Sequence, residues 1–252
     1  NPAGIAGSEG MGFNAGMTQW LVETQVMNAG FVMPMMGGTI GLSVVSVNYG
    51  EIMESGWAGT TEFVFEPNQG SFTPTDMSLQ ASYGRSLSDK FSLGGTAKMI
   101  SQSIDDVSIS GLAFDIGTQF NTGYRGISMG AVISNFGPDV DSQAPDDASY
   151  EEFPGMSLPM TFSFGVVGEA IPGLNAGLNV LKQADMAQEF IFNGEYSVAG
   201  LASLRFSYNI SNPQQPMSFG AGLGMAGITA NVAFSTTLHF DPVMRFGIGY
   251  AL

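Results

Sequence analysis

The sequence predicts an all-β fold, a closed antiparallel transmembrane β-barrel of about fourteen strands. Of 252 residues, 44% are hydrophobic and only 12% are charged. No apolar run reaches the ~18 to 20 residues that a membrane helix needs, which excludes helical spanning. Apolar residues instead alternate with small or polar ones, which is the strand period. The 35 glycines disfavour helices and suit tight turns and a crowded interior.

The last eight residues carry the clearest alternation. One face of this segment holds Phe246, Ile248, Tyr250 and Leu252, whereas the other holds Arg245 and three small residues. A terminal strand with an apolar row for lipid and a small or polar row for the interior is typical of the strand that closes a transmembrane barrel. In a soluble protein, a second layer would have to cover the apolar row.

The same period predicts the other strands in chain order. The first half contains Met17–Thr24, Met27–Met35, Gly38–Tyr49, Met77–Ser86, Phe91–Ser103, Ser108–Phe120 and Ile127–Phe136. The second half contains Leu158–Gly168, Leu174–Lys182, Glu189–Ser197, Ala202–Ile210, Met217–Met225, Ile228–Thr236 and Pro242–Leu252. We therefore assign residues 17–252 to the barrel and residues 1–16 to an N-terminal segment. The even strand number is usual for a closed antiparallel barrel.

The connections between strands predict the orientation. If Leu252 lies on the periplasmic side, alternate connections are short turns, such as Met36-Gly37 and Ala226-Gly227. The two longest connections, Gly50–Asp76 and Gly137–Ser157, then lie outside. Short periplasmic turns and long external loops are the arrangement of bacterial outer-membrane barrels.

The net charge of −15 gathers in the predicted external loops. The second long loop contributes Asp139, Asp141, Asp146, Asp147, Glu151 and Glu152. This acidic loop can be interpreted in two ways. The charges either serve solubility or adaptation to a saline habitat, or they have a function, which would be to gather cations or to dock a basic partner. Nucleic acid is excluded as a partner because no basic stripe exists to follow phosphates.

Five charged residues fall on the interior side of the predicted strands: Lys98, Asp115, Glu195, Arg205 and Arg245. An inward position is preferred, since Lys or Arg facing the bilayer midplane costs about 2–4 kcal/mol. They either line a water path or neutralise one another inside a filled barrel.

The sequence contains no catalytic or metal-binding constellation, so we expect a protein that is not an enzyme and needs no cofactor or metal. The single histidine, His239, lies in a predicted external loop, and the chain has no cysteine. Neither a histidine metal cluster nor a Ser-His-Asp arrangement can be built from these residues.

Several segments resemble a known family. Asn1-Pro-Ala-Gly-Ile-Ala is similar to the NPAG element near the start of FadL-type outer-membrane barrels. Six further segments are similar to the PorV/PorQ branch of these barrels: Gln19–Thr24, Gly38–Val44, Tyr49–Ile52, Tyr83–Gly94, Ile133–Pro138 and the closing strand. The resemblance is collinear over nearly the whole chain. It implies a fourteen-stranded barrel in the outer membrane of a Bacteroidota-like bacterium, often tied to type IX secretion.

Family members carry several dozen residues before the NPAG element, including a glycine-rich segment that helps to fill the lumen. On this resemblance, residues 1–16 are the remnant of a lumen-filling region. The resemblance implies a PorV-like accessory or docking barrel for protein secretion or surface attachment. Its partners would be outer-membrane lipid and a secretion-system or secreted protein, or copies of itself. A FadL-like channel for hydrophobic small molecules and a structural barrel in a surface array or fibre remain alternatives.

Overall fold

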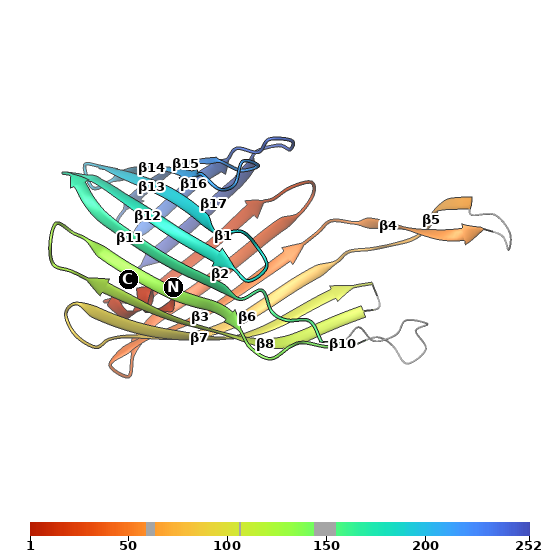
Figure 1. Cartoon of the computed structure of the whole chain (residues 1–252), viewed down its shortest axis with the longest axis horizontal. Helices are drawn as coiled ribbons and strands as arrows, with labels where there is room; N and C mark the ends of the chain where they lie inside the picture. Colours follow the sequence, from red (N-terminus) through yellow and green to blue (C-terminus); the bar gives the residue numbers. More distant parts are fainter. Residues whose placement is uncertain (59–63, 106, 144–154) are drawn as a thin grey trace.

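The computed structural model describes residues 1–58, 64–105, 107–143 and 155–252, nearly all of them in antiparallel strands around a central lumen (Figure 1). A short 3-10 helix, η1 (Pro2–Gly7), precedes the strands. The strands are β1 (Gly12–Gln19), β2 (Gln25–Met35), β3 (Gly38–Asn48), β4 (Ile52–Ala58), β5 (Val64–Phe72), β6 (Thr75–Ser86), β7 (Phe91–Ile104), β8 (Val107–Asn121), β9 (Ser128–Phe136), β10 (Ser142–Gln143), β11 (Thr161–Ile171), β12 (Leu174–Gln183), β13 (Glu189–Val198), β14 (Ala202–Asn209), β15 (Met217–Met225), β16 (Ile228–Ser235) and β17 (Val243–Ala251).

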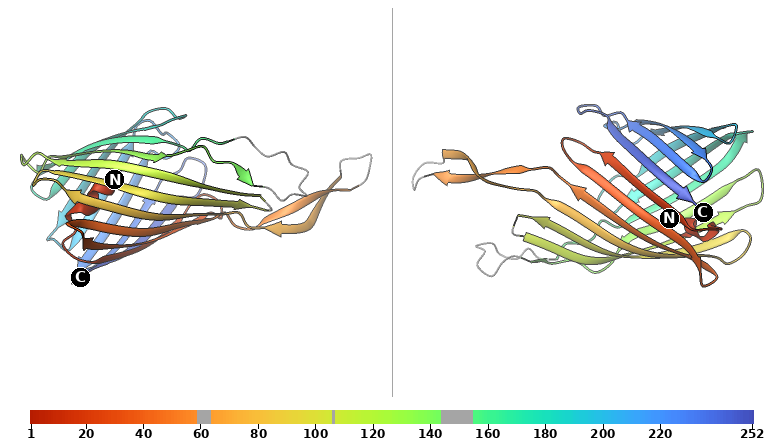
Figure 2. Two further views of the ribbon diagram at one scale, coloured as in Figure 1. Left: turned by 90° about the horizontal axis from the view of Figure 1, so that it is seen from below. Right: turned by 180° about the vertical axis from the view of Figure 1, so that it is seen from behind.

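The strands form a closed barrel, as the sequence predicts. The main sheet has 15 strands, and β10 is a two-residue extension beside β8, so fourteen strands make the wall. The first and last strands pair, with Phe13 opposite Tyr250. A further pairing of β8 with β9 joins the two ends of the sheet and closes it. The hairpin β4–β5 is a separate two-stranded sheet that projects beyond the wall (Figure 1, Figure 2).

Two parts of the sequence prediction were wrong. The first strand starts at Gly12, five residues before the predicted Met17, so the wall includes part of the segment assigned to residues 1–16. Small residues in this stretch hide the alternation, and only pairing with β2 and β17 reveals its register. The long connection after β3 was predicted as a loop, but it contains β4 and β5. Every other predicted segment overlaps one strand of the wall.

The barrel is apolar on the outside. In β14, Leu204 and Phe206 are 57% and 43% exposed on the outward row, and they alternate with the inward Ser203 and Arg205. Among the described residues, the buried hydrophobic residues are Ala3, Ala113 and Val243. This interior is too small to stabilise a soluble fold, whereas lipid covers the outward rows. No helix in the described part of the chain is long and apolar enough to cross a membrane.

The two ends of the barrel differ in their connections. One end has short turns such as Met36-Gly37 and Ala226-Gly227, whose φ angles are 57° and 72°, and 53° and 80°. Two consecutive positive φ values define the type I′ hairpin, whose twist matches that of the strands. The chain termini lie at this end, where the Leu252 N–H donates to Met11 O at 2.9 Å (Figure 1).

The orientation can be tested with single cysteines, because the chain has none of its own. We expect Asp185→Cys and Gln214→Cys, in connections at the long-loop end, to react with a membrane-impermeant maleimide on intact cells. Asp89→Cys and Pro172→Cys, in short turns, should react only after the outer membrane is opened. The reverse labelling pattern would contradict the assigned orientation.

Candidate functional site

The N-terminal helix covers one side of the barrel interior near the short-turn end. The side-chain Oδ1 of Asn1 caps η1 by accepting the Ala3 N–H at 3.0 Å, and Asn1 Nδ2 donates to Thr118 O at 2.9 Å. The helix contacts β3, β6, β7 and β8. A Cβ on the inward Gly84 would lie 2.8 Å from Ile5 Cγ1, so the helix packs this closely only because that strand position has no side chain.

A second inward cluster holds Lys98, Asp115 and Asn135 together. Lys98 Nζ lies 2.8 Å from Asp115 Oδ2 and donates to Asn135 Oδ1 at 2.8 Å. The Asn135 N–H donates to Asp115 Oδ1 at 2.9 Å. The register between β8 and β9 shifts here, and Asn135 has a φ of 58°. The two side chains are only 13% and 12% exposed, so each is shielded from solvent beside its partner, and together they hold the β-bulge at Asn135.

The chain beyond this bulge folds against the inner face of β8. Ala113, an inward residue of β8, is fully buried, and a Cβ on Gly137 would meet the β8 backbone beside it. Val140 packs on Gly111 and exchanges backbone hydrogen bonds with Met156 at 3.0 and 2.8 Å. The β6–β9 side of the interior is therefore filled by this segment, by η1 and by the ion pair.

The predicted acidic loop is only partly described. Asp139 and Asp141 flank Val140 and are exposed. The remaining members of the predicted set lie outside the described residues: Asp146, Asp147, Glu151 and Glu152.

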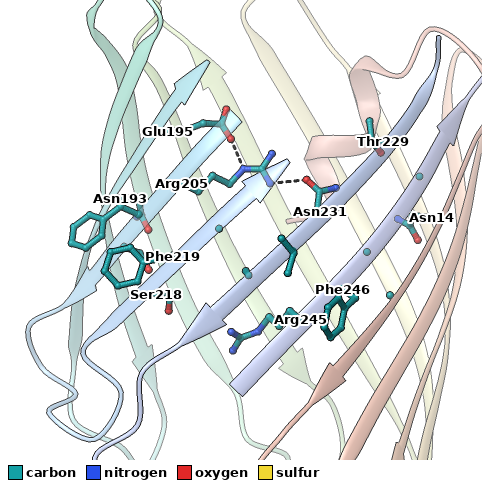
Figure 3. Close-up of a pocket in the computed structure, with 18 of the residues that line it drawn as sticks. Asn14, Asn193, Glu195, Arg205, Ser218, Phe219, Thr229, Asn231, Arg245 and Phe246 are labelled. Atoms are coloured by element: carbon teal, nitrogen blue, oxygen red, sulfur yellow. Dashed lines mark hydrogen bonds and ion pairs between the residues drawn. The ribbon is translucent and has the colours of Figure 1, made fainter. Parts of the chain in front are cut away.

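The opposite side of the interior is open. A cavity of about 890 Å³ runs along the wall formed by β1, β2 and β12–β17 (Figure 3). Five asparagines line it: Asn14, Asn28, Asn175, Asn193 and Asn231. Phe206, Phe219 and Phe246 also border it, but the register places their side chains on the outward rows. Phe206 packs on Phe219 with their ring centroids 5.3 Å apart.

Arg205 forms the centre of the open wall. Its Nε lies 2.6 Å from Glu195 Oε2, and its Nη1 donates to Asn231 Oδ1 at 2.8 Å (Figure 3). The side chain crosses β15 beside Gly222, where a Cβ would lie 3.4 Å from Nη1. The Arg205 and Glu195 side chains are 45% and 40% exposed, so this pair contacts the solvent of the lumen.

The side chain of Arg245 has uncharged partners. Its Nη1 donates to Ser235 Oγ at 2.6 Å, and that hydroxyl lies 2.7 Å from Ser218 Oγ. Its Cζ lies 5.9 Å from the centre of the Trp20 ring, within cation–π range. No carboxylate of the described residues lies within ion-pair distance of this guanidinium.

The five predicted interior charges therefore divide into two groups. The structure places all five on inward rows, four of them in two ion pairs and Arg245 with hydroxyl and aromatic partners. The uncharged partners Asn135, Asn231 and Ser235 were missed at the sequence level. Their alternation marks them as inward, but only the cross-strand register shows which charge each one meets.

Tyr49 forms a further contact at the long-loop end, just beyond β3. Its hydroxyl donates to Asp76 Oδ2 at 2.6 Å, and this bond to a carboxylate raises the pKa of Tyr49 to about 12. Gln102 donates to the same oxygen at 3.2 Å. These bonds fix the point where the chain leaves the wall for the β4–β5 hairpin.

In the described part of the chain, no group of three or more potential metal ligands occurs.

No protein-family model matches the chain, and no curated protein matches it either. Solved structures do match. The toluene transporter TodX of Pseudomonas putida aligns at 10% identity with a TM-score of 0.64, over 100% of this chain and 91% of TodX. The deltaS2 mutant of TodX, described as a monoaromatic hydrocarbon channel, aligns over the same shares at 10% identity with a TM-score of 0.58.

The KdgM porin aligns at 8% identity over 96% of this chain and 99% of its own, with a TM-score of only 0.49. Identities this low establish the fold alone. The chain thus shares the barrel fold of TodX, with the closed wall and apolar outward rows of a bacterial outer-membrane protein. These similarities do not support the finer resemblance to PorV/PorQ.

The two ion pairs should differ in their effect on stability. Asp115→Asn should lower the free energy of unfolding by about 3–5 kcal/mol, because it leaves the mostly buried Lys98 without its charged partner. Glu195→Gln should cost less than about 1 kcal/mol, since lumen water solvates Arg205 in its absence. Urea unfolding in detergent micelles, followed by tryptophan fluorescence, measures both. Equal losses would contradict the distinction.

Proposed function

We propose that this barrel is a passive channel for small solutes across the outer membrane. The observation that carries the proposal is the cavity along β12–β17 inside a closed wall. The helix η1 and the segment after β9 pack on the other side of the interior. Neither of them lines this cavity.

The lining residues support a path along the barrel. They extend from Gly126 and Gly249, near the short turns, to Thr18 and Arg245, near the long loops. Water-accessible charges at Arg205 and Glu195 lie between these ends. A hydrated cavity that passes the middle of the wall is what a diffusion channel needs, whereas a purely structural barrel can fill its interior.

The fold similarity favours the same class. TodX is a toluene transporter and its mutant is described as a channel, so the alternative of a FadL-like channel has more support than the secretion-linked accessory barrel. The similarity does not extend to the solute, because identity is only 10%.

A tryptophan placed in the path tests the proposal. In planar lipid bilayers, the wild-type barrel should give discrete conductance steps, and Ser207→Trp should reduce them severalfold because Ser207 lines the cavity. The matched control is Phe206→Trp, which changes the neighbouring outward residue and should leave conductance unchanged. Wild-type protein that inserts as a folded barrel but carries no current would overturn the proposal.

A second candidate function is docking of a secreted or surface protein, as in the PorV-like interpretation. The observation in its favour is the β4–β5 hairpin, which projects beyond the barrel at the long-loop end of a chain with a net charge of −15 (Figure 1). Such a projection offers an arm for a basic partner, and the screened field of exposed charges would make the binding salt-sensitive.

Replacing residues 52–72 by a short Gly-Ser linker separates the two functions. If the barrel docks a partner, cross-linking on intact cells should join the wild type to a discrete set of secreted proteins, and the linker variant should lose them. Conductance should remain, since the hairpin does not line the cavity. Equal cross-linking by both forms would contradict docking through the hairpin.

A further inference from the structure

Two arginines stand on the same open wall of the barrel. The register places Arg205 opposite Gly220, Gly220 opposite Ala233, and Ala233 opposite Arg245. The two arginine Cα atoms are thus on one row, three strands apart, which corresponds to about 14 Å. The wall between them carries only a glycine and an alanine. Space between the two arginines is therefore left open to the cavity.

The guanidinium groups lie at different depths along the barrel. Arg245 reaches toward the long-loop end, where its Nη1 meets Ser235. Arg205 reaches toward the short-turn end, where its Nη1 meets Asn231 (Figure 3). A solute entering from the long-loop end would meet Arg245 first and the Arg205–Glu195 pair second.

The charge of this wall is opposite to that of the whole protein. The charged residues lining the cavity are Glu195, Arg205 and Arg245, a net charge of +1, whereas the chain carries −15. Charged side chains that line a narrow path decide which ions pass it. Arg245 has the stronger influence, because no carboxylate in the described structure neutralises it.

The inward side chains of the rest of the lining are mostly amides and hydroxyls, and Val167 and Ala233 are apolar exceptions. The five cavity asparagines are joined by serine and threonine, and the aromatic side chains of the described barrel strands belong to the outward rows. Asn231 and Asn193 have hydrogen bonds within the protein, but an apolar solute would still displace water from the free donors and acceptors of the amides, which costs free energy. A hydrocarbon such as toluene is therefore a poor fit to this cavity, despite the similarity in fold to TodX.

We infer that the channel conducts small hydrophilic anions, such as monocarboxylates, with Arg245 as the first and the Arg205–Glu195 pair as the second contact. This inference rests on the proposed channel function. Conduction needs sites that attract an ion without holding it. Glu195 supplies that balance at Arg205, and the Trp20 ring with the Ser235 hydroxyl leaves the charge of Arg245 in place.

The experiment measures reversal potentials in planar bilayers of neutral lipid, under a tenfold gradient of potassium chloride and then of potassium acetate. The wild type should be anion-selective with both salts. Arg245→Gln should lower the anion-to-cation permeability ratio severalfold, and Arg245→Lys should restore most of it because the charge returns. Glu195→Gln should raise the ratio.

The matched control is Arg85→Gln, which removes the same charge from an outward position of β6 and should leave the ratio unchanged. Each variant is known to be folded if it still gives conductance steps. A cation-selective wild type, or equal ratios for Arg245→Gln and Arg85→Gln, would overturn the anion assignment and leave the channel standing. A folded wild type without current would overturn both.

Discussion

The structure depends on closure of the backbone hydrogen-bond ladder. In a bilayer no water is present to satisfy a free strand edge, so every N–H and C=O of the wall needs a neighbouring strand. The pairing of β1 with β17 joins the two ends of the chain, and the pairing of β8 with β9 joins the two ends of the sheet. Lipid can then cover the outward apolar rows, and the inward rows are free to vary.

The inward rows fill the interior on one side of the barrel and leave it open on the other. On the β6–β9 side, the interior is filled by η1, the Lys98–Asp115 pair and the segment around Val140. On the β12–β17 side, glycine, alanine and asparagine leave an open cavity. A fourteen-stranded wall encloses more space than its own side chains fill, so partial filling is a natural outcome for this size. The open half contains the path of the proposed channel.

The inward charges differ in their surroundings according to their location in the barrel. Both ion pairs are formed by residues on neighbouring strands, but one is mostly buried and the other is nearly half exposed. Burial makes the first pair part of the β-bulge at Asn135, whereas solvent contact makes the second a feature of the lumen. Arg245 differs from both, since its partners are neutral and it lines the cavity.

The sequence by itself determined the architecture, because a side-chain period of two, strand length and turn chemistry are local properties. Alternation in residues 245–252 already distinguishes the lipid face from the lumen face, and it places Arg245 inside. Small residues weakened this signal at Gly12–Gln19, where the first strand was misplaced. Only the tertiary structure decided which charges meet. Glu195 and Arg205 are ten residues apart and become neighbours through a hairpin, but Asn231 joins them across a third strand. The division into filled and open sides is equally non-local, since it depends on where η1 and the segment after β9 fold back into the lumen.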